Sequence, residues 1–563
     1  MATTPLTPRP AATLILTRDG TDGIEVLLMQ RTQQADFIAG AYVFPGGAVD
    51  SADHCERLLP HCLGHDDASA SQLLGIQCGG LAYAIAAIRE CFEEAGLLLA
   101  CNAGGDFVDM ADDSTLQDYA ALRRRLNSGE LSLAELCWLR NLRLPLDRLA
   151  YFAHWITPPG ATRRYDTRFY VACAPERQAP SHDDSEMIDH LWIRPGEALQ
   201  RQKNGQFKLV YSTITILKAL SGFANTTELM AHARELRDIP TRVPRRALYK
   251  TGSRVLIQGH PAYAEICKLD PQGEGGARCE ILPGEVTRLS ARVRRIAAPN
   301  AGMMTGPGTN TYLLGSGDDI AVLDPGPASP EHVQTLLNAA GGRIRWILAT
   351  HTHPDHSPAA LLLQQATGAK LLGVEAPVGL RQDESFRPDV RLEHGQRLQL
   401  GNCTLRVIHT PGHASNHLCF MLEEEKLLFT GDHIMQGSTV VISPPDGCMS
   451  AYLRSLELLQ QEDIEYLAPA HGFLMDNPLQ MIERLQQHRL KRERQILEAV
   501  QTLGCASIEK LRPLVYRHVA TPLQPAATRS LLAHLLRLVE LDLVIEKDGL
   551  WSLRNAACAG SYG

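Results

Sequence analysis

The chain has 563 residues, 44% of them hydrophobic and 21% charged, which excludes a mainly disordered or fibrous protein. Its 55 basic and 63 acidic side chains give a net charge of −8, which disfavours general binding to nucleic acid or to anionic membranes. The sequence has no long apolar run, no secretory signal pattern and no Cys-x-x-Cys pair among its 14 cysteines. We therefore expect a cytoplasmic protein with reduced thiols and no membrane span.

Apolar patterns before residue 240 predict a mixed α+β domain. The expected elements, in chain order, are strands at 13–17 and 25–29, a helix at 81–96, two helices within 116–141, strands near 150–156 and 168–174, and a helix near 210–221. Residues 241–288 are rich in Pro, Gly and Arg, and we expect a linker with short strands there.

The pattern changes from residue 289 onward. Over 289–478, short apolar strands that each end in a polar loop alternate with helices, which predicts a layered α/β domain. Residues 479–557 are mostly helical and end in two strands around Asp548-Gly549. This last pattern predicts a small winged-helix domain.

Three carboxylates gather on the helix expected at 81–96. Glu90, Glu93 and Glu94 stand at positions i, i+3 and i+4, so they share one face of that helix. Bunched carboxylates repel one another unless a cation lies among them, and oxygen ligands suit Mg²⁺ or Mn²⁺. A solvated charged face is the alternative interpretation.

Two segments resemble the two ends of the Nudix box, G-x5-E-x7-R-E-U-x-E-E-x-G-U. Residues 44–47 (FPGG) match its beginning, and residues 89–96 (RECFEEAG) match its end. Asp53 stands where the family has its first Glu, and about 28 extra residues separate it from Arg89. The resemblance implies an α+β Nudix fold over 1–240, with insertions near 54–80 and 104–148.

The Nudix resemblance also implies roles for individual residues. Glu90, Glu93 and Glu94 would bind Mg²⁺ or Mn²⁺, and Arg89 would orient a glutamate through an ion pair. Arg89 and Glu93 are therefore the expected catalytic residues of this domain. Glu186, in a downstream loop, is a further candidate carboxylate.

Residues 27–47 keep the spacing of a motif found in coenzyme-A-type Nudix hydrolases. Leu27, Leu28, Arg31, Gly40 and Phe44 match that motif, whereas Asp36 replaces a basic residue that would favour an anionic ligand. The resemblance implies a small-molecule substrate, either a coenzyme A derivative or another nucleoside diphosphate compound. The residues expected to contact that substrate are Arg31, Gly46, Gly47, Asp53 and Glu186.

The densest cluster of metal-ligating side chains follows a buried strand expected at 344–350. Residues 351–356 read HTHPDH, and four of these six side chains are potential ligands. His413, Asp432 and His471 each follow another predicted strand, and strand ends lie along one edge of a layered α/β fold. Imidazole and carboxylate groups suit Zn²⁺ and related ions, and seven ligands suit two ions. The alternative, unrelated surface histidines, requires several coincidences.

The H-x-H-x-D-H pattern with the later His, Asp and His resembles the metallo-β-lactamase superfamily over about 290–475. The resemblance implies an αββα sandwich with two Zn²⁺ or similar divalent ions. The first ion would be bound by His351, His353 and His413 and the second by Asp355, His356 and His471, with Asp432 bridging them. Two close ions lower the pKa of a shared water, so the implied reaction is hydrolysis of an ester, thioester or phosphodiester. Asp355 would also act catalytically by taking a proton.

Finer motifs resemble the β-lactamase-like protein 2 group of that superfamily. They are residues 308–312 (GTNTY), 323–326 (LDPG), 431–447 and the tail 488–497 (HRLKRERQIL). That group includes a single-strand endoribonuclease, and its relatives include thioesterases that release acyl carrier protein products.

The sequence leaves the substrate open. The basic stretch at 484–517 suits either single-stranded RNA or a solvated helix face, and no aromatic platform for bases is interleaved with it. Three hypotheses remain: a bifunctional hydrolase, a nucleic-acid-processing protein with a degenerate Nudix binding module, and a non-catalytic scaffold. The tail is also a candidate contact for a second subunit, which would make an oligomer.

Overall fold

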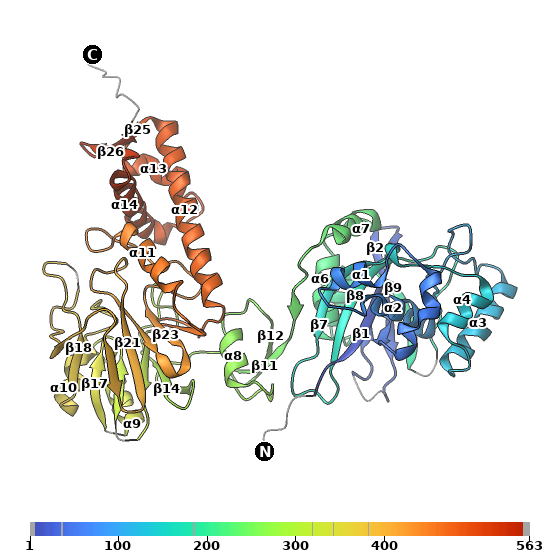
Figure 1. Ribbon diagram of the computed structural model, residues 1–563, viewed down its shortest axis with the longest axis horizontal. Coiled ribbons are helices and arrows are strands. Elements are labelled where there is room, and N and C mark those ends of the chain that lie inside the picture. Colours follow the sequence, from blue (N-terminus) through green and yellow to red (C-terminus); the bar gives the residue numbers. More distant parts are fainter. Residues whose placement is uncertain are drawn as a thin grey trace, which may run out of the picture. The chain divides into compact units, whose positions relative to one another are not determined.

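The computed structural model describes residues 6–34, 38–183, 186–317, 319–341, 343–380 and 382–554. The chain divides into two compact units, Met1–Arg246 with Gln272–Glu274 and Ala247–Pro271 with Gly275–Gly563 (Figure 1). Asp36, in the predicted coenzyme-A-type motif, lies outside the described residues. In the described part of the chain, no helix combines the length and the apolar character needed to cross a membrane.

The first unit is built on one mixed sheet. Its described strands pair in the order β10-β7-β8-β1-β2-β3, with β4 added beside β1 and β9 beside β2. They are β1 (Arg9–Gly20), β2 (Gly23–Arg31), β3 (Tyr42–Val43), β4 (Gly46–Ala48), β7 (Ala150–Ile156), β8 (Tyr165–Cys173), β9 (Met187–Ile193) and β10 (Thr241–Arg242). Strands β1 and β8 run parallel, whereas β1 and β2 form an antiparallel hairpin. The four strands expected before residue 240 are therefore present.

Helices cover this sheet, and α2 is the one that positions the carboxylates. The described helices are α1 (Asp67–Leu74), α2 (Gly80–Ala95), α3 (Asp113–Asn127), α4 (Leu133–Arg140), α5 (Pro195–Lys203), α6 (Tyr211–Leu220) and α7 (Thr226–Glu235), with short 3₁₀ turns η1 (Ser51–His54), η2 (Glu56–His61) and η3 (Leu146–Arg148). Helix α2 ends at Gly96, whose φ of 67° is a left-handed conformation that glycine adopts without a steric penalty. Ile85, Ile88 and Phe92 of α2 are fully buried against the sheet.

The two insertions are packed structure and not loose loops. Residues 54–80 carry η2, α1 and β5 (Cys62–Leu63), and β5 pairs with β6 (Leu144–Pro145) from the second insertion. Apolar side chains of both insertions, among them Leu58, Leu74 and Leu136, belong to the same buried cluster as α2. The insertions therefore enlarge the core around the carboxylate helix.

The second unit contains two sheets packed face to face. The seven-stranded sheet has the order β13-β14-β15-β16-β17-β18-β19 and the five-stranded sheet the order β20-β21-β22-β23-β24. Leu314 and Leu348 of the first sheet share one buried cluster with Leu405, Phe420 and Phe429 of the second. Helices α9 and α10 pack outside the first sheet and α11 outside the second, which gives an αββα sandwich (Figure 1).

The predicted alternation of strands with helices is present only around α9, α10 and α11, and elsewhere in the described part of the sandwich the strands follow one another without an intervening α-helix. The strands are β13 (Val286–Arg288), β14 (Val293–Ala297), β15 (Asn310–Leu314), β16 (Ile320–Leu323), β17 (Ile344–Leu348), β18 (Lys370–Gly373), β19 (Val390–Arg391), β20 (Arg397–Leu400), β21 (Cys403–His409), β22 (Leu418–Leu422), β23 (Leu427–Gly431) and β24 (Tyr466–Pro469). The helices are α9 (Pro330–Ala340), α10 (Ala359–Thr367) and α11 (Met449–Leu459), with the turn η4 (Glu423–Glu425).

Part of the stretch that composition marks as a linker is buried structure. It forms β11 (Arg245–Tyr249), β12 (Gly252–Leu256) and α8 (Tyr263–Leu269). Glu265 of α8 is fully buried and accepts two hydrogen bonds from the Arg295 guanidinium, at 2.6 and 2.9 Å. Glu265 also accepts a hydrogen bond from the backbone N–H of Leu474. These contacts anchor α8 to the sandwich.

The C-terminal region forms a winged helix that is continuous with the sandwich. It consists of α12 (Pro478–Leu503), β25 (Cys505–Ala506), α13 (Ile508–Val515), η5 (Thr521–Leu523), α14 (Gln524–Glu540), β26 (Val544–Lys547) and β27 (Leu550–Leu553). Ile482 and Leu485 at the start of α12 pack in the sandwich core, whereas Ile496 and Val500 near its end pack in the winged-helix core. Helix α12 therefore joins the two cores rigidly.

Candidate metal centre and carboxylate helix

Seven predicted ligands meet at one edge of the sandwich. They extend from the loops that follow β17, β21, β23 and β24, because each loop begins where a buried strand reaches that edge. The structure sorts them into two groups, His351, His353 and His413, and Asp355, His356, Asp432 and His471. Within each group the ligand atoms all lie within 4.8 Å of one another.

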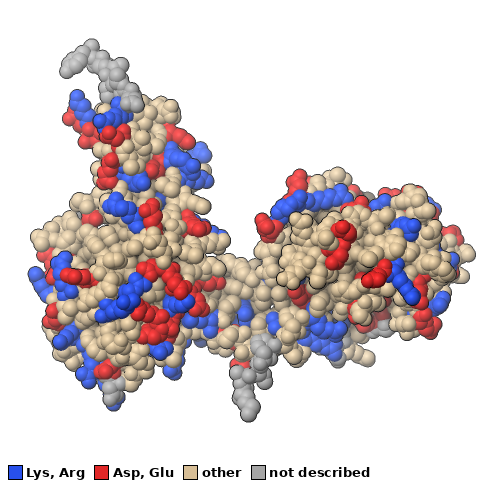
Figure 2. All heavy atoms as spheres, in the orientation of Figure 1, with Lys and Arg blue, Asp and Glu red and all other residues tan. Residues whose placement is uncertain are grey.

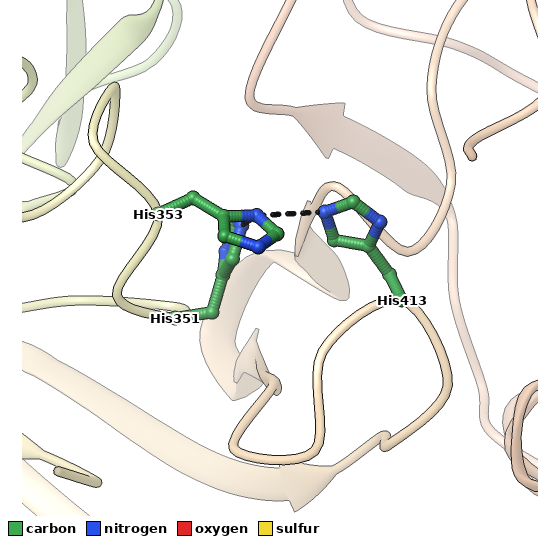
Figure 3. A group of neighbouring side chains, drawn as sticks. All are labelled: His351, His353 and His413. Atoms are coloured by element: carbon green, nitrogen blue, oxygen red, sulfur yellow. Dashed lines mark hydrogen bonds between the residues drawn. The ribbon is translucent and has the colours of Figure 1, made fainter. Parts of the chain in front are cut away.

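The three-histidine group is compact. Figure 3 shows the rings of His351, His353 and His413 turned toward one another. The Nδ1 atom of His353 lies 2.8 Å from Nε2 of His351 and 3.0 Å from Nε2 of His413. Three imidazole nitrogens at these separations match the donor set that a divalent ion such as Zn²⁺ takes.

Asp432 lies between the two groups. Its Oδ2 is 3.7 Å from Nε2 of His413, and its Oδ1 is 3.6 Å from Nε2 of His356 and 3.3 Å from Nε2 of His471. Asp355 completes the second group, with its Oδ2 3.4 Å from Nε2 of His471. One carboxylate thus faces both ligand sets.

The donor atoms fit bound cations. His356 Nε2 and Asp432 Oδ1 are buried and have no hydrogen-bond partner among the described residues, a costly arrangement unless they bind something. The opposite ring nitrogens are engaged: Nδ1 of His413 faces the Val441 carbonyl at 2.8 Å, and Nδ1 of His471 faces the Gly308 carbonyl at 3.2 Å. Such contacts leave each Nε2 lone pair free for a metal ion.

Burial and neighbouring charges give the two groups different electrostatics. Burial, with the neighbouring histidines, holds the pKa of His351 well below its usual value and lowers the pKa of His353 to about 4. Burial also lowers the pKa of His356 and His471, but nearby carboxylates outweigh it. They hold the pKa of His356 well above its usual value and raise that of His471 to about 9. The first group therefore offers neutral imidazoles and the second group an acid-rich set.

The Nudix-type carboxylates lie around Arg89. Its guanidinium binds both carboxylate oxygens of Asp53 at 2.9 Å, and its Nη1 lies 2.9 Å from Glu90 and 2.7 Å from Glu93. Asp53 is buried, and it contacts Arg89 despite the long insertion between them in the sequence. Glu94 is buried separately and accepts a hydrogen bond from the backbone N–H of Gly46 at 2.8 Å.

These glutamates do not converge on one point as the sandwich ligands do. In the described residues, groups of three or more clustered ligand atoms occur only in the second unit. Burial raises the pKa of Glu90 to about 7 and, together with Glu90, raises the pKa of Glu94 well above its usual value. A Cβ at Gly47 would lie 2.4 Å from Glu90 Oε1, so a larger residue there would displace that carboxylate. The solvated-face interpretation is therefore wrong, because these carboxylates are mostly buried.

Arg31 and Glu186 also lie side by side in the first unit. Arg31 Nη2 is 3.9 Å from Glu186 Oε2, and the Glu186 carbonyl accepts a hydrogen bond from the N–H of Thr32. The Glu186 side chain is 66% exposed, so it is available to a ligand.

Comparisons with known proteins identify three regions of the chain. Family models match residues 8–212 as the NUDT19 Nudix domain, 304–471 as the metallo-beta-lactamase superfamily and 507–551 as the beta-lactamase associated winged helix domain. An atrochrysone carboxyl ACP thioesterase of Aspergillus chevalieri is 36% identical, and the match covers 40% of this chain and 70% of that protein. An atrochrysone carboxyl ACP thioesterase of Aspergillus fumigatus is 32% identical, and the match covers 40% of this chain and 71% of that protein. The chain belongs to the metallo-β-lactamase superfamily.

The metallo-β-lactamase domain follows a Nudix domain and precedes the winged helix, as predicted, and the protein is a hydrolase. Two solved structures are also similar. A Nudix hydrolase from Alicyclobacillus acidocaldarius is 29% identical, covers 40% of this chain and 96% of that chain, and has a TM-score of 0.33. A metallo-beta-lactamase family protein from Thermus thermophilus is 21% identical, with 47% and 100% covered and a TM-score of 0.41.

Asp324 supports the metallo-β-lactamase site, although the sequence analysis assigned it no role. Its carboxylate accepts hydrogen bonds from the N–H and the hydroxyl of Thr350, at 2.7 and 2.9 Å. Its Oδ2 also lies 3.1 Å from Nδ1 of His356. The LDPG motif was the available signal, because it places a carboxylate at another strand end of the same edge. His417, whose Nε2 faces the N–H of Asp432 at 3.2 Å, had no comparable signal.

A cavity of about 970 Å³ opens from the metallo-β-lactamase ligands. It is lined by His353, Asp355, His413 and Asp432 and also by residues of α12 and α14. The winged helix therefore supplies part of the wall beside the candidate metal centre.

Proposed function

We propose that the chain is a bifunctional metal-dependent hydrolase. In this proposal residues 289–478 hydrolyse an acyl thioester, residues 1–240 hydrolyse a nucleoside diphosphate derivative such as coenzyme A, and residues 479–557 are an accessory domain. Asp432 carries the first half of the proposal, because its two oxygens face the two ligand groups 3.3–3.7 Å away. This arrangement suits a pair of Zn²⁺ or similar ions.

The proposed reaction adds water to the acyl carbon and breaks its bond to sulfur, releasing a carboxylic acid and a thiol. Two bound metal ions would lower the pKa of the attacking water and polarise the carbonyl group of the thioester. Asp355 lines the cavity with a side chain that is 28% exposed, so it can reach substrate. Burial raises the pKa of Asp355, but His356 and His471 outweigh it and hold that pKa at about 2. Asp355 is thus a carboxylate, able to hold an ion and to receive a proton.

Two observations favour a thioester over RNA. Two of the curated relatives are named as ACP thioesterases. Acidic and basic side chains are interspersed over the visible face of each unit, without the broad basic track that a nucleic-acid backbone requires (Figure 2). RNA cleavage remains the competing outcome of the experiment below.

The Nudix half is proposed to act on a diphosphate with Mg²⁺ or Mn²⁺. Arg89 supports this, because its ion pairs with Asp53 and Glu93 hold α2 against the loop after β4. Asp53, which stands where the family has its first glutamate, thus pairs with Arg89 in spite of the insertion. Glu90, Glu93 and Glu94 are the proposed ion ligands, and Arg31 and Glu186 are proposed to contact the substrate.

A substrate panel on the full chain tests both activities. Acyl-thioesters, single-stranded RNA and coenzyme A are offered to the wild type and to the His353→Ala, Asp432→Ala and Glu93→Gln variants. We expect the first two variants to lose thioester turnover and keep diphosphate turnover, and Glu93→Gln to show the reverse pattern. RNA cleavage with inert thioesters would overturn the thioesterase proposal, and thioester turnover that survives both sandwich variants would overturn the metal assignment.

A further inference from the structure

The cavity beside the metal centre has both apolar and cationic side chains in its wall. The apolar ones include Met303, Met304, Val440 and Val441 from the sandwich. The cationic ones are Arg489, Arg492 and Arg529 of α12 and α14. A substrate in this cavity thus meets apolar and cationic groups as well as the proposed metal ligands.

Arg489 is the one buried arginine among these lining residues. Only 3% of this residue is exposed, and its Nε has no hydrogen-bond partner. One Nη donates to the Val440 carbonyl, and the guanidinium lies 5.2 Å from the centre of the Tyr452 ring. In the described residues no carboxylate pairs with it. Burying a cation without a counter-charge is costly, so a buried, unpaired arginine in a cavity wall points to an anionic ligand.

The nearby acids are already engaged. Glu493, one turn further along α12, lies 3.3 Å from Arg537 and 3.7 Å from His534. Asp446 is the one acid among the described lining residues that is not a proposed ion ligand, and it accepts hydrogen bonds from Ser415 and Gln382. The acids of the chain itself therefore do not neutralise the positive charge of Arg489 in the cavity wall.

Two further arginines extend the site. Arg492 stands three residues after Arg489, so both lie on one face of α12. Its guanidinium lies 4.4 Å from the centre of the Tyr516 ring and donates to the Val515 carbonyl, which holds it in the cavity wall. Arg529, on α14, is exposed and lines the same cavity. Guanidinium groups match phosphate oxygens in geometry as well as charge.

We infer that Arg489, Arg492 and Arg529 bind the phosphate of a phosphopantetheinyl arm whose thioester lies at the metal centre. This inference rests on the proposed thioesterase function. The apolar lining residues Met303, Met304 and Val441 suit the largely uncharged part of such an arm between its sulfur and its phosphate. Single-stranded RNA suits the cavity less well, because Tyr516 is the one Phe, Tyr or Trp among the described lining residues and Arg492 stacks on it. Coenzyme A and acyl carrier protein share this arm.

The test compares two substrates that differ only in the phosphate. Acyl-phosphopantetheine and acyl-pantetheine are offered to the full chain with Zn²⁺, and the ratio of their kcat/KM values is measured. We expect the wild type to prefer the phosphorylated substrate by roughly tenfold to a hundredfold, as for one to two charge-assisted hydrogen bonds. Arg492→Gln and Arg529→Gln should bring the ratio toward one. The control Arg494→Gln, at an exposed position of α12 outside the cavity lining, should keep it.

Arg489→Gln is the stronger variant, but its burial gives it a second role in folding. If Arg489→Gln unfolds, the Arg492→Gln and Arg529→Gln variants, at less buried positions, still test the phosphate site. The kcat/KM values of acyl-coenzyme A and of acyl carrier protein are then compared. The substrate with the higher value is the source of the arm.

Each result has a distinct meaning. A wild-type ratio near one, or a ratio that none of the three arginine variants changes, would overturn the phosphate site while leaving the thioesterase intact. No turnover of either substrate would overturn the thioesterase itself. RNA cleavage that falls in Arg492→Gln would show that the arginines hold a nucleic-acid backbone, which also overturns the inference.

Discussion

Replacing Asp324 with asparagine should weaken the second proposed ion site directly and the first one indirectly, because the Thr350 hydroxyl that contacts Asp324 also lies 3.1 Å from Nδ1 of His351. In the native chain Oδ1 of Asp324 accepts from the N–H of Thr350, and Oδ2 faces both the Thr350 hydroxyl and Nδ1 of His356. Once an ion replaces the Nε2 proton of His356, the contact with Oδ2 keeps the remaining ring proton on Nδ1 and leaves Nε2 to the ion. Asparagine keeps the shape of the side chain but replaces one acceptor with a donor.

Neither orientation of the new amide satisfies the site. If its oxygen faces the N–H of Thr350, its NH₂ group faces Nδ1 of His356 and favours a proton on Nε2, the atom that should bind the ion. If the amide is turned over, two donors meet at Thr350 in a buried setting. A buried unsatisfied donor costs about 1–3 kcal/mol. We therefore expect a roughly tenfold to hundredfold loss of affinity for the second ion.

Zinc titration against a competing chelator measures this effect. Wild-type protein should bind two Zn²⁺ in the sandwich, whereas Asp324→Asn should lose more affinity at the site that contains His356, which it contacts directly, than at the site that contains His351, which it reaches through Thr350. Asp389→Asn is the matched control, because Asp389 also accepts a backbone N–H, that of Leu371, without contacting a proposed ligand. Unchanged affinity for both ions in Asp324→Asn would refute the proton-placement argument.

Three further predictions test the remaining parts of the chain. Asp53→Ala removes two charge-assisted hydrogen bonds from Arg89, so calorimetry should show the first unit destabilised by about 3 kcal/mol, with diphosphate turnover reduced and thioester turnover unaffected. Glu265→Gln leaves Arg295 buried and unpaired, which should cost about 3–5 kcal/mol and lower the melting temperature of the second unit by roughly 5–8 °C. Replacing both Glu265 and Arg295 with Met should recover most of that loss, and a double variant as unstable as the single would contradict the reasoning. Chelation should abolish both activities, with Zn²⁺ restoring thioester turnover and Mg²⁺ restoring diphosphate turnover; activity that persists without added metal would argue against either centre.

Local patterns in the sequence were sufficient for the main strands and for helix α2, and for naming the candidate ligands, but not for elements such as α1, α7 and α8. The ligands of the sandwich occur in short runs directly after apolar strands, and the spacing of Glu90, Glu93 and Glu94 is a helical spacing. A strand or a helix has a fixed period, so a few consecutive residues determine which side chains share a face. That is why β17, α2 and the final hairpin of β26 and β27 were predictable without any knowledge of packing.

Contacts between distant segments needed the tertiary structure. Asp53 and Arg89 are 36 residues apart, Asp324 and His356 are 32 apart, and Glu265 and Arg295 are 30 apart. No periodic pattern connects such pairs, because their separation in space depends on how whole elements pack. The same holds for the cavity, whose cationic wall exists only because α12 and α14 pack beside the metal centre. The sequence by itself determined which groups could bind metal, and only the packing of distant elements decided which of them meet and what lies beside them.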